Sequence, residues 1–482
     1  MAAFGQLVEI LVDPIGIGLV SAAAAAHRLS RYAARSLRGA GWMFRKVWFL
    51  LALLLAFWPG VGHGASKREP PDYGAPKPEP GAEVLLWVPR VALFPVWVVS
   101  EYGLRRPIGA LVRVAEREQW PAHVIQFFTF GDRDQITLFP SAFFDFGLKP
   151  SVGVNLGWKY FLAEPNTLHA HFGTWGPDWL AAKVVDQYEL GAHDSVALDA
   201  NVVRRKDIPF YGMGPRSGSQ IAARFEATTV ESAPSYERRF WRSSRLAARA
   251  GLRALYFGAG SCCGARSLSD AVAAGALPAP PGLGQNYAAA FQSLTLALDS
   301  RRPRPESGSG VRVETRGEAV FAPGTGPTTR RSWVSYGATL GAAYDIWSAR
   351  TIALSVEADM VDPLQGTVPF PDQVTLGGER PMRGFLRDRL IDRSAAVGTL
   401  QYTWPVWVFL DGVLQADVGN VFGPHLQGFD AGLLRLSTGI GVRSNGDRDS
   451  GFELLVAGGT DPFENGLRYS AFRLVIGSHH GF

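Results

Sequence analysis

The chain has 482 residues, a net charge of +5, 19% charged residues and a mean hydropathy near zero. It is therefore less charged than most soluble enzymes and less apolar than a bundle of membrane helices, whereas its 55 glycines and 12% aromatic residues suit strands that face lipid on one side and a polar lumen on the other. No basic tract with interleaved aromatics accompanies the positive charge, so we expect no nucleic-acid partner.

A signal peptide is predicted over residues 43–64. The basic tetrapeptide MFRK at 43–46 precedes the apolar run VWFLLALLLAFWPG, and glycines at 62 and 64 precede a plausible cleavage site. The apolar run is shorter than the roughly 20 residues of a spanning helix, which favours cleavage over the alternative of an uncleaved anchor. Residues 1–42 are then an N-terminal extension, either an extended leader or a start assigned too far upstream.

Residues 65–121 predict a short periplasmic segment that is proline-rich and then helical. The stretch 66–82 is a proline-rich linker, and 84–120 has the apolar spacing of short amphipathic helices broken at prolines. These helices could form a small plug or lid, or lie on the inner face of the membrane. No other segment of the sequence is long and apolar enough to predict a spanning helix, so any other part of the chain that crosses a membrane must do so with strands.

Residues 122–482 predict an all-β fold of alternating strands of about ten residues, punctuated by Gly, Pro, Asn and Asp. Short connections alternate with long ones at 205–221, 259–286 and 364–393. Tight periplasmic turns and long outer loops of a transmembrane barrel produce this alternation. The length of the segment is enough for about sixteen strands, and a direct tally gives sixteen or seventeen, according to whether RFEATTVESAPSYERRFW within 222–258 is one long strand or two. An even number is expected for closure, which selects sixteen. The predicted fold is therefore a 16-stranded antiparallel transmembrane β-barrel.

Cys262 and Cys263 are the two cysteines of the chain, and they are adjacent. Neighbouring cysteines seldom form a bridge because the geometry strains the intervening peptide. We therefore expect a loop pair without a role. Because no metal-ligand spacing with histidine is visible either, no metal and no cofactor are expected.

The final segment, AFRLVIGSHHGF, places Phe472, Leu474, Ile476 and Phe482 on one face and ends on an aromatic residue. A closing strand of this kind is typical of an outer-membrane barrel, where the machinery that inserts such barrels reads it. The four residues are therefore a predicted barrel-assembly signal, and the barrel-assembly machinery is an expected partner.

Three motifs fall in the predicted barrel. The sequence GGERPMRGF (377–385) lies in the loop before five candidate strands at 394–409, 411–422, 432–444, 451–459 and 467–482. The sequence LQADVGNVF contains Asp417 and Gly419, and FYGMGP occupies 210–215. In these motifs and their order the chain resembles the BamA/TamA superfamily of outer-membrane barrels, also called the bacterial surface antigen family, over about residues 122–482.

The resemblance and the strand alternation together predict a latch between loop and lumen. Leu414, Ala416 and Val418 would face lipid, so Asp417 and Gly419 would face the lumen. The Arg383 guanidinium could then hold the Asp417 carboxylate bidentately, with Gly384 allowing a tight turn beside Phe385. Related proteins usually present a glutamate on the preceding strand, where this chain has Gln401. Its amide could accept a hydrogen bond from Arg383 without adding charge.

The resemblance implies insertion or translocation of proteins at the bacterial outer membrane, with loop 364–393 as a plug in the lumen. Relatives that handle proteins normally carry polypeptide-transport-associated domains, and the 57 residues of 65–121 lack that pattern. A pore or scaffold without client handling is therefore the alternative. An enzyme is not expected, because the chain has no Gly-x-Ser-x-Gly elbow and its histidines show no triad spacing. The expected partners are outer-membrane lipids, the barrel-assembly machinery and protein clients.

Overall fold

The computed structural model describes residues 126–143, 148–260, 262–302, 308–324, 330–346, 350–378, 381–407, 410–444 and 450–480, with six isolated positions between 102 and 118. The chain divides into two units, Met1–Gly64 and Ala65–Phe482, and every described residue belongs to the second. The predicted signal peptide and the proline-rich linker lie outside the described residues. Among the residues that are described, no helix has both the length and the apolar character needed to span a membrane.

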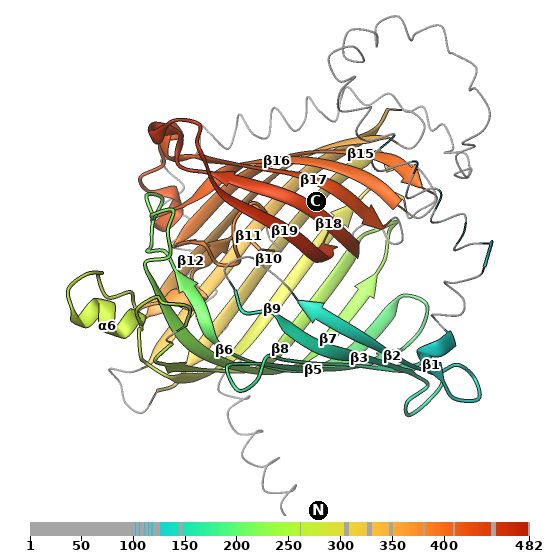
Figure 1. Ribbon diagram of the computed structural model, residues 1–482. Coiled ribbons are helices and arrows are strands. Elements are labelled where there is room, and N and C mark those ends of the chain that lie inside the picture. Colours follow the sequence, from blue (N-terminus) through green and yellow to red (C-terminus); the bar gives the residue numbers. More distant parts are fainter. Residues whose placement is uncertain are drawn as a thin grey trace, which may run out of the picture. The chain divides into compact units, whose positions relative to one another are not determined.

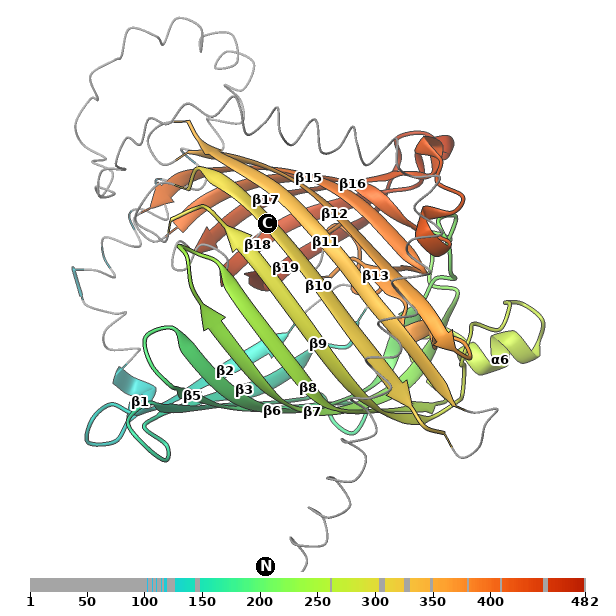
Figure 2. The same ribbon diagram turned by 180° about the vertical axis from the view of Figure 1, so that it is seen from behind.

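The described part of the chain forms one antiparallel sheet of 17 strands, curved into a barrel with strongly tilted strands (Figures 1 and 2). The strands are β1 (Thr129–Phe130), β2 (Ile136–Phe143), β3 (Ser151–Lys159), β4 (Asn166–Thr174), β5 (Trp179–Glu189), β6 (Asp194–Phe210), β7 (Ala223–Arg239), β8 (Arg245–Gly258), β9 (Tyr287–Asp299), β10 (Gly310–Ala322), β11 (Arg331–Asp345), β12 (Thr351–Gln365), β15 (Ser394–Trp407), β16 (Leu410–Phe422), β17 (Arg435–Ser444), β18 (Ser450–Thr460) and β19 (Tyr469–His480). Each pairs with the next in chain order, β12 directly with β15. Because β1 has only two residues, sixteen full-length strands remain, which confirms the predicted fold class.

Exposed apolar and buried side chains alternate along the strands, which shows which face of the barrel wall meets lipid. On β12 the side chains of Ile352, Leu354 and Val356 are exposed on the outside, while those of Ala353 and Ser355 between them are buried. Such apolar surface would favour aggregation in water but is what the hydrocarbon of a bilayer accepts. The outer wall is thus the lipid-facing side, and the other face of each strand lines the lumen.

Successive connections alternate between the two ends of the barrel. Those at 211–222, 259–286, 366–393, 423–434 and 461–468 lie at one end, which is the outer end because the predicted periplasmic turns are the short ones. That end carries α6 (Leu268–Ala273) and the short helices η4 (Pro424–Leu426), η5 (Ala431–Leu433) and η6 (Phe463–Asn465), which gather there in Figure 1. The three predicted long loops are on one side, as expected.

Two boundary expectations change in the structure. The first long loop is shorter than predicted because β6 continues to Phe210 through a register shift between Arg205 and Ile208. The doubtful stretch 222–258 forms one long strand, β7, a turn and then β8. Both changes reflect the unusual length of the β6–β7 hairpin, in which each strand has 17 residues.

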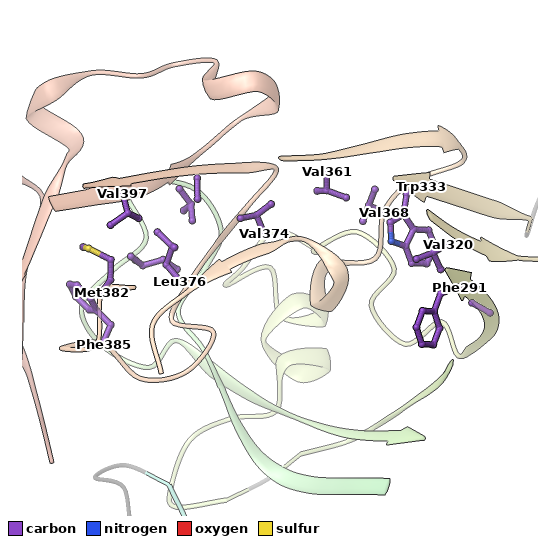
Figure 3. Packing of buried hydrophobic residues seen from close by; sticks show 14 of the residues in the cluster. Phe291, Val320, Trp333, Val361, Val368, Val374, Leu376, Met382, Phe385 and Val397 are labelled. Carbon is purple, nitrogen blue, oxygen red and sulfur yellow. The ribbon is translucent and has the colours of Figure 1, made fainter. Parts of the chain in front are cut away.

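Loop 366–393, which we call the inner loop, packs inside the outer half of the barrel. Its residues Val374, Leu376, Met382 and Phe385 belong to one buried apolar cluster with lumen-facing residues of the wall such as Val397 and Trp333. Figure 3 shows Met382, Phe385 and Leu376 near Val397, with Trp333, Val320 and Phe291 grouped toward the other wall. The core of the barrel is therefore built partly from its own loop.

The outer loop 259–286 contains a disulfide bond between Cys262 and Cys263. The expectation that these neighbours stay unbridged is wrong. The adjoining segment is tied to the wall, because Arg224 donates its backbone N–H to the carbonyl of Arg266 at 2.9 Å. Ser267 then caps α6, its hydroxyl accepting a hydrogen bond from the Asp270 N–H at 3.1 Å.

Candidate functional site

The inner loop folds as a hairpin with a broad tip. Its strand β13 (Val374–Leu376) pairs with β14 (Leu390–Asp392). Gly377 and Gly378 have φ angles of +103° and +77°, a region that side chains other than glycine rarely occupy. The Gly378 N–H donates to the Phe385 carbonyl at 2.9 Å, which closes the tip around the motif. The double glycine therefore turns the chain toward the wall.

Arg383 forms a buried ion pair with Glu453 on β18. The Glu453 side chain is almost fully buried, and its second oxygen lies 3.2 Å from Nη2 of Arg443 on β17. Two guanidinium groups thus converge on one carboxylate. Burying a carboxylate is costly unless donors surround it, so the site depends on this pairing.

Asp417 of β16 holds the backbone of the motif. Its carboxylate accepts hydrogen bonds from the Met382 N–H at 3.1 Å, from the Thr399 hydroxyl at 2.9 Å and from the Gln415 amide at 2.8 Å. The positive charge of Arg383 also attracts this carboxylate electrostatically. The sequence-based prediction brought the right loop to Asp417 but assigned Arg383 the wrong ion-pair partner, because the ion pair is made with Glu453.

Gly384 and Phe385 fit the motif against β18 at very short range. The Gly384 N–H donates to the Ser437 hydroxyl at 2.9 Å, and a Cβ atom on Gly384 would lie 2.2 Å from the Gly458 carbonyl oxygen. A Cβ atom on Gly459 would likewise lie 2.5 Å from the Phe385 ring. Gly384 therefore serves close approach of two backbones, whereas the predicted tight turn is carried by Met382, whose φ is +69°.

The other predicted latch residues lie nearby but make different contacts. The side-chain amide oxygen of Gln401 accepts a hydrogen bond from Arg443 at 3.4 Å, whereas the prediction paired it with Arg383. Gly419 lies where a Cβ atom would be 2.4 Å from the Ala396 carbonyl oxygen, so it permits close packing of β16 on β15.

Arg473 connects the inner loop to β19, the last strand. Its Nη1 donates to the carbonyls of Gly378 and Phe385, each at 3.1 Å, and to that of Arg383 at 3.4 Å. Sequence reasoning missed both Arg473 and Glu453. The alternation could have revealed them, because each is a charged residue at a lumen-facing position between lipid-facing apolar neighbours.

The predicted assembly-signal residues occupy the lipid-facing side of β19 as far as the strand is described. Phe472 is 70% exposed and Ile476 is 43% exposed, and Leu474 between them is partly buried. Phe482 lies outside the described residues. The common face agrees with the alternation, and the role in assembly stays a prediction.

The glycine-rich segment after β6 joins the outer loops. The Gly214 N–H donates to the Ile391 carbonyl at 2.9 Å, and Asn420 and Arg435 donate to carbonyls of the segment 215–217 at 3.0 and 2.8 Å. We call these contacts of segment 211–218 the outer clasp. It includes a hydrogen bond of 3.0 Å from Arg389 to the Ser217 hydroxyl and an ion pair of 2.9 Å between Arg216 and Glu464. Burial, with the nearby Arg435 charge, lowers the pKa of Arg389 to about 9.

Comparisons with known proteins agree with this architecture. Residues 212–446 match the Omp85 superfamily domain, a span that runs from the outer clasp through the inner loop to β17. No curated protein matches the sequence.

Two solved outer-membrane barrels are similar to the chain at low identity. BamA from Haemophilus ducreyi lacking POTRA domains 1–3 is 12% identical, with a TM-score of 0.48 over 72% of this chain and 70% of that one. CdiB from Acinetobacter baumannii is 11% identical, with a TM-score of 0.44 over 71% of this chain and 59% of that one. Residues 212–446 are thus an Omp85 superfamily domain, within a bacterial outer-membrane β-barrel protein.

Proposed function

We propose that the chain takes part in inserting proteins into the outer membrane or translocating them across it. Members of the Omp85 superfamily insert or secrete proteins at that membrane and are not enzymes, and we propose the same for this chain. The observation that supports this most directly is the Arg-Gly-Phe motif of the inner loop. It is seated on lumen-facing residues of β16, β17, β18 and β19.

In this proposal the inner loop is a plug in the lumen, held by the contacts of Met382–Phe385. The buried Arg383–Glu453 pair supports a fixed position for the plug, since moving it would leave a carboxylate with one donor fewer. The lipid-facing row on β19, with Phe472, Leu474 and Ile476, supports recognition of the chain itself by the barrel-assembly machinery.

A pore or scaffold that handles no client is the second candidate. It is favoured by the sequence of 65–121, which lacks the pattern of a polypeptide-transport-associated domain. Partner proteins that supply client binding would reconcile this absence with the first candidate.

Depletion of the chain in its bacterium, followed by quantitative mass spectrometry of the outer-membrane and secreted proteins, tests the proposal. We expect a set of barrel or secreted proteins to fall in abundance. Expression of the wild-type chain should restore them, and the Arg383→Ala variant should restore them incompletely.

Arg387→Ala is the matched control, because Arg387 lies in the same loop with 73% of its side chain exposed. It should restore the proteome as the wild type does. An unchanged proteome after depletion would refute protein handling and favour the pore or scaffold.

A further inference from the structure

The inner loop makes a second set of buried contacts, before it reaches the Arg-Gly-Phe motif. In its short helix η3 (Phe370–Asp372), Phe370 belongs to a different apolar cluster from that of Met382 and Phe385, which also includes Val368 and Val374 on either side of η3. Phe370 is fully buried, and its ring centroid lies 5.1 Å from that of Phe225 on β7 and 5.7 Å from those of Phe210 and Phe257. Aromatic groups in this arrangement bury a large apolar area and fix the ring in place.

Two residues beyond Phe370, a carboxylate meets the charged wall of the lumen. Asp372 accepts a hydrogen bond from the Tyr287 hydroxyl on β9, and its Oδ1 lies 3.5 Å from Nη1 of Arg253 on β8. Arg253 is also paired with Glu231 on β7 at 2.7 Å and with Glu318 on β10 at 3.2 Å. The loop carboxylate therefore joins a network that spans four strands.

These two sets of contacts lie on nearly opposite sides of the barrel. If β2 is counted as the first of the sixteen full-length strands, β8 and β9 are the seventh and eighth, and β17 and β18 are the fourteenth and fifteenth. Seven strands of sixteen separate them, which is close to half of the circumference. The inner loop thus reaches across the lumen from one wall to the other.

We infer that the inner loop is a cross-brace with two separate anchors, and that Phe370 and Asp372 form a second anchor which must be released independently of the Arg383 motif before the lumen can open. We call the Phe370–Asp372 contacts the aromatic anchor and the Met382–Phe385 contacts the motif anchor. This inference rests on the proposed plug function, since it describes how the plug is held.

The aromatic anchor should respond to pH. Burial raises the pKa of Asp372 to about 6, although the Tyr287 hydroxyl and Arg253 act in the opposite direction and Glu318 acts in the same one. Once released into water, the carboxyl would return toward its ordinary value of 3.8. The Asp372 carboxyl has a higher pKa in the anchored state than in the released state, so low pH favours the anchored state. Its stability falls as the pH rises toward about 6 and changes little above that.

Cysteine labelling of the purified full chain in liposomes can follow the two anchors separately. The native cysteines are bonded to each other, so a maleimide reports only an introduced probe. Val368→Cys places a probe at a 3% exposed position two residues before Phe370, beside Trp333 and away from Met382 in Figure 3. Met382→Cys places one at a fully buried position in the motif anchor.

Each probe is combined with Asp372→Ala and, separately, with Arg383→Ala. Loss of a hydrogen bond to a charged group corresponds to about tenfold or more in an equilibrium constant. We expect Asp372→Ala to accelerate labelling of the Val368→Cys probe by about tenfold while changing the Met382→Cys rate little, and Arg383→Ala to do the reverse. A loop that moves as one body would instead accelerate both probes equally in both variants, which would overturn the inference.

Asp372→Asn provides a test that a purely structural role would not pass. The amide can keep the Tyr287 contact but cannot ionise. The ratio of the wild-type labelling rate to the Asp372→Asn rate cancels the titration of the thiol. It should rise as the pH increases toward about 6 and then level off. A ratio that stays constant with pH would overturn the proton-sensitive anchor.

Asp388→Asn, at a carboxylate of the same loop that is 45% exposed, is the matched control and should show no such profile. Folding of every variant is checked by its heat-dependent migration in SDS gels. If Asp372→Ala does not fold, Tyr287→Phe, which removes only the hydroxyl donor, must accelerate the Val368→Cys probe for the inference to stand. No client is present, so the result is independent of the proteome experiment.

Discussion

Glu453 is the residue on which the loop contacts of the C-terminal wall converge. It is 1% exposed, and its two oxygens face guanidinium groups from the inner loop and from β17. A carboxylate in this position is stabilising only as long as both partners remain, because desolvation offsets much of the Coulomb attraction. The pair therefore acts chiefly to fix the position of the inner loop, and breaking it should be costly.

A double-mutant cycle with Arg383→Met and Glu453→Gln measures this coupling. Arg443 still faces Glu453 in the Arg383→Met variant, so we expect a loss of about 2–3 kcal/mol in the free energy of unfolding, below the full cost of an unpaired buried charge. The coupling energy should be about 1–3 kcal/mol. Urea unfolding of the liposome-inserted barrel, followed by tryptophan fluorescence, gives both quantities.

The exposed pair Arg387–Asp388, at 3.7 Å in the same loop, is the control for this cycle. Solvent screens it, so its coupling should be close to zero. If the losses in the free energy of unfolding of the two single variants simply add up in the double variant, the ion pair does not help to hold the inner loop in place.

At the scale of residues, the sequence predicted which side of the barrel wall a side chain faces better than it predicted which residue that side chain contacts. Alternation along β16 correctly placed Asp417 in the lumen, but it carries no information on how far a loop descends or which wall it touches. Arg383 therefore could not be matched to Glu453, which is 70 residues away on a strand with no recognised motif. Gln401 was expected beside Arg383 for the same reason, and in the structure it bonds Arg443.

At the scale of elements, the inner loop and β18 have complementary shapes where they pack together. The missing side chain of Gly384 lets its backbone approach that of Gly458, and the missing side chain of Gly459 leaves space for the Phe385 ring. Packing of this kind tolerates little added volume, because the atoms that would have to move are backbone atoms of a paired strand.

Gly384→Ala should therefore displace the motif from the wall. The added Cβ atom would lie 2.2 Å from the Gly458 carbonyl oxygen, and overpacking of this kind costs about 1–3 kcal/mol. Urea unfolding should show the loss, and limited proteolysis should show a more accessible inner loop.

Gly317→Ala is the control, because a Cβ atom at that position on β10 has no neighbour within 4 Å. Its free energy of unfolding should stay within about 0.5 kcal/mol of the wild type. Equal proteolysis of the Gly384→Ala variant and the wild type would contradict the close-packing explanation.

Sequence predicted most of the strands, since the period of two and the Gly-rich turns are local signals. The five strands after the inner loop lie within three residues of their expected bounds. What it could not predict is the length of the β6–β7 hairpin, because its outer end leaves the alternation of the membrane wall: Pro209 and Phe210 are both buried on β6, as are residues 223–225 on β7. The disulfide was missed because adjacent cysteines seldom form one, and this general tendency does not hold for Cys262 and Cys263.

At the scale of the whole barrel, the two ends have different tasks. One end has short turns, and the other bears the long loops, the inner loop and the outer clasp (Figure 1). This polarity predicts which end faces the medium outside the cell.

Labelling with a membrane-impermeant maleimide tests the orientation. Gln427→Cys, at an exposed position in loop 423–434, should be labelled in intact cells. Gly191→Cys, at an exposed position in the turn 190–193, should be labelled only after the outer membrane is permeabilised. The reverse pattern would invert the barrel and remove the basis for an outer loop that folds inward.

The outer clasp has a consequence for the order of folding. It joins Arg389 to Ser217 across 172 residues and Arg216 to Glu464 across 248 residues. Contacts so distant in sequence form late, because the strands between their two ends have to pair first. Glu464 lies between β18 and β19, so the last hairpin must be in place before this tie can form. We therefore expect the clasp to close as the final event of barrel maturation, sealing a chain whose wall is already complete.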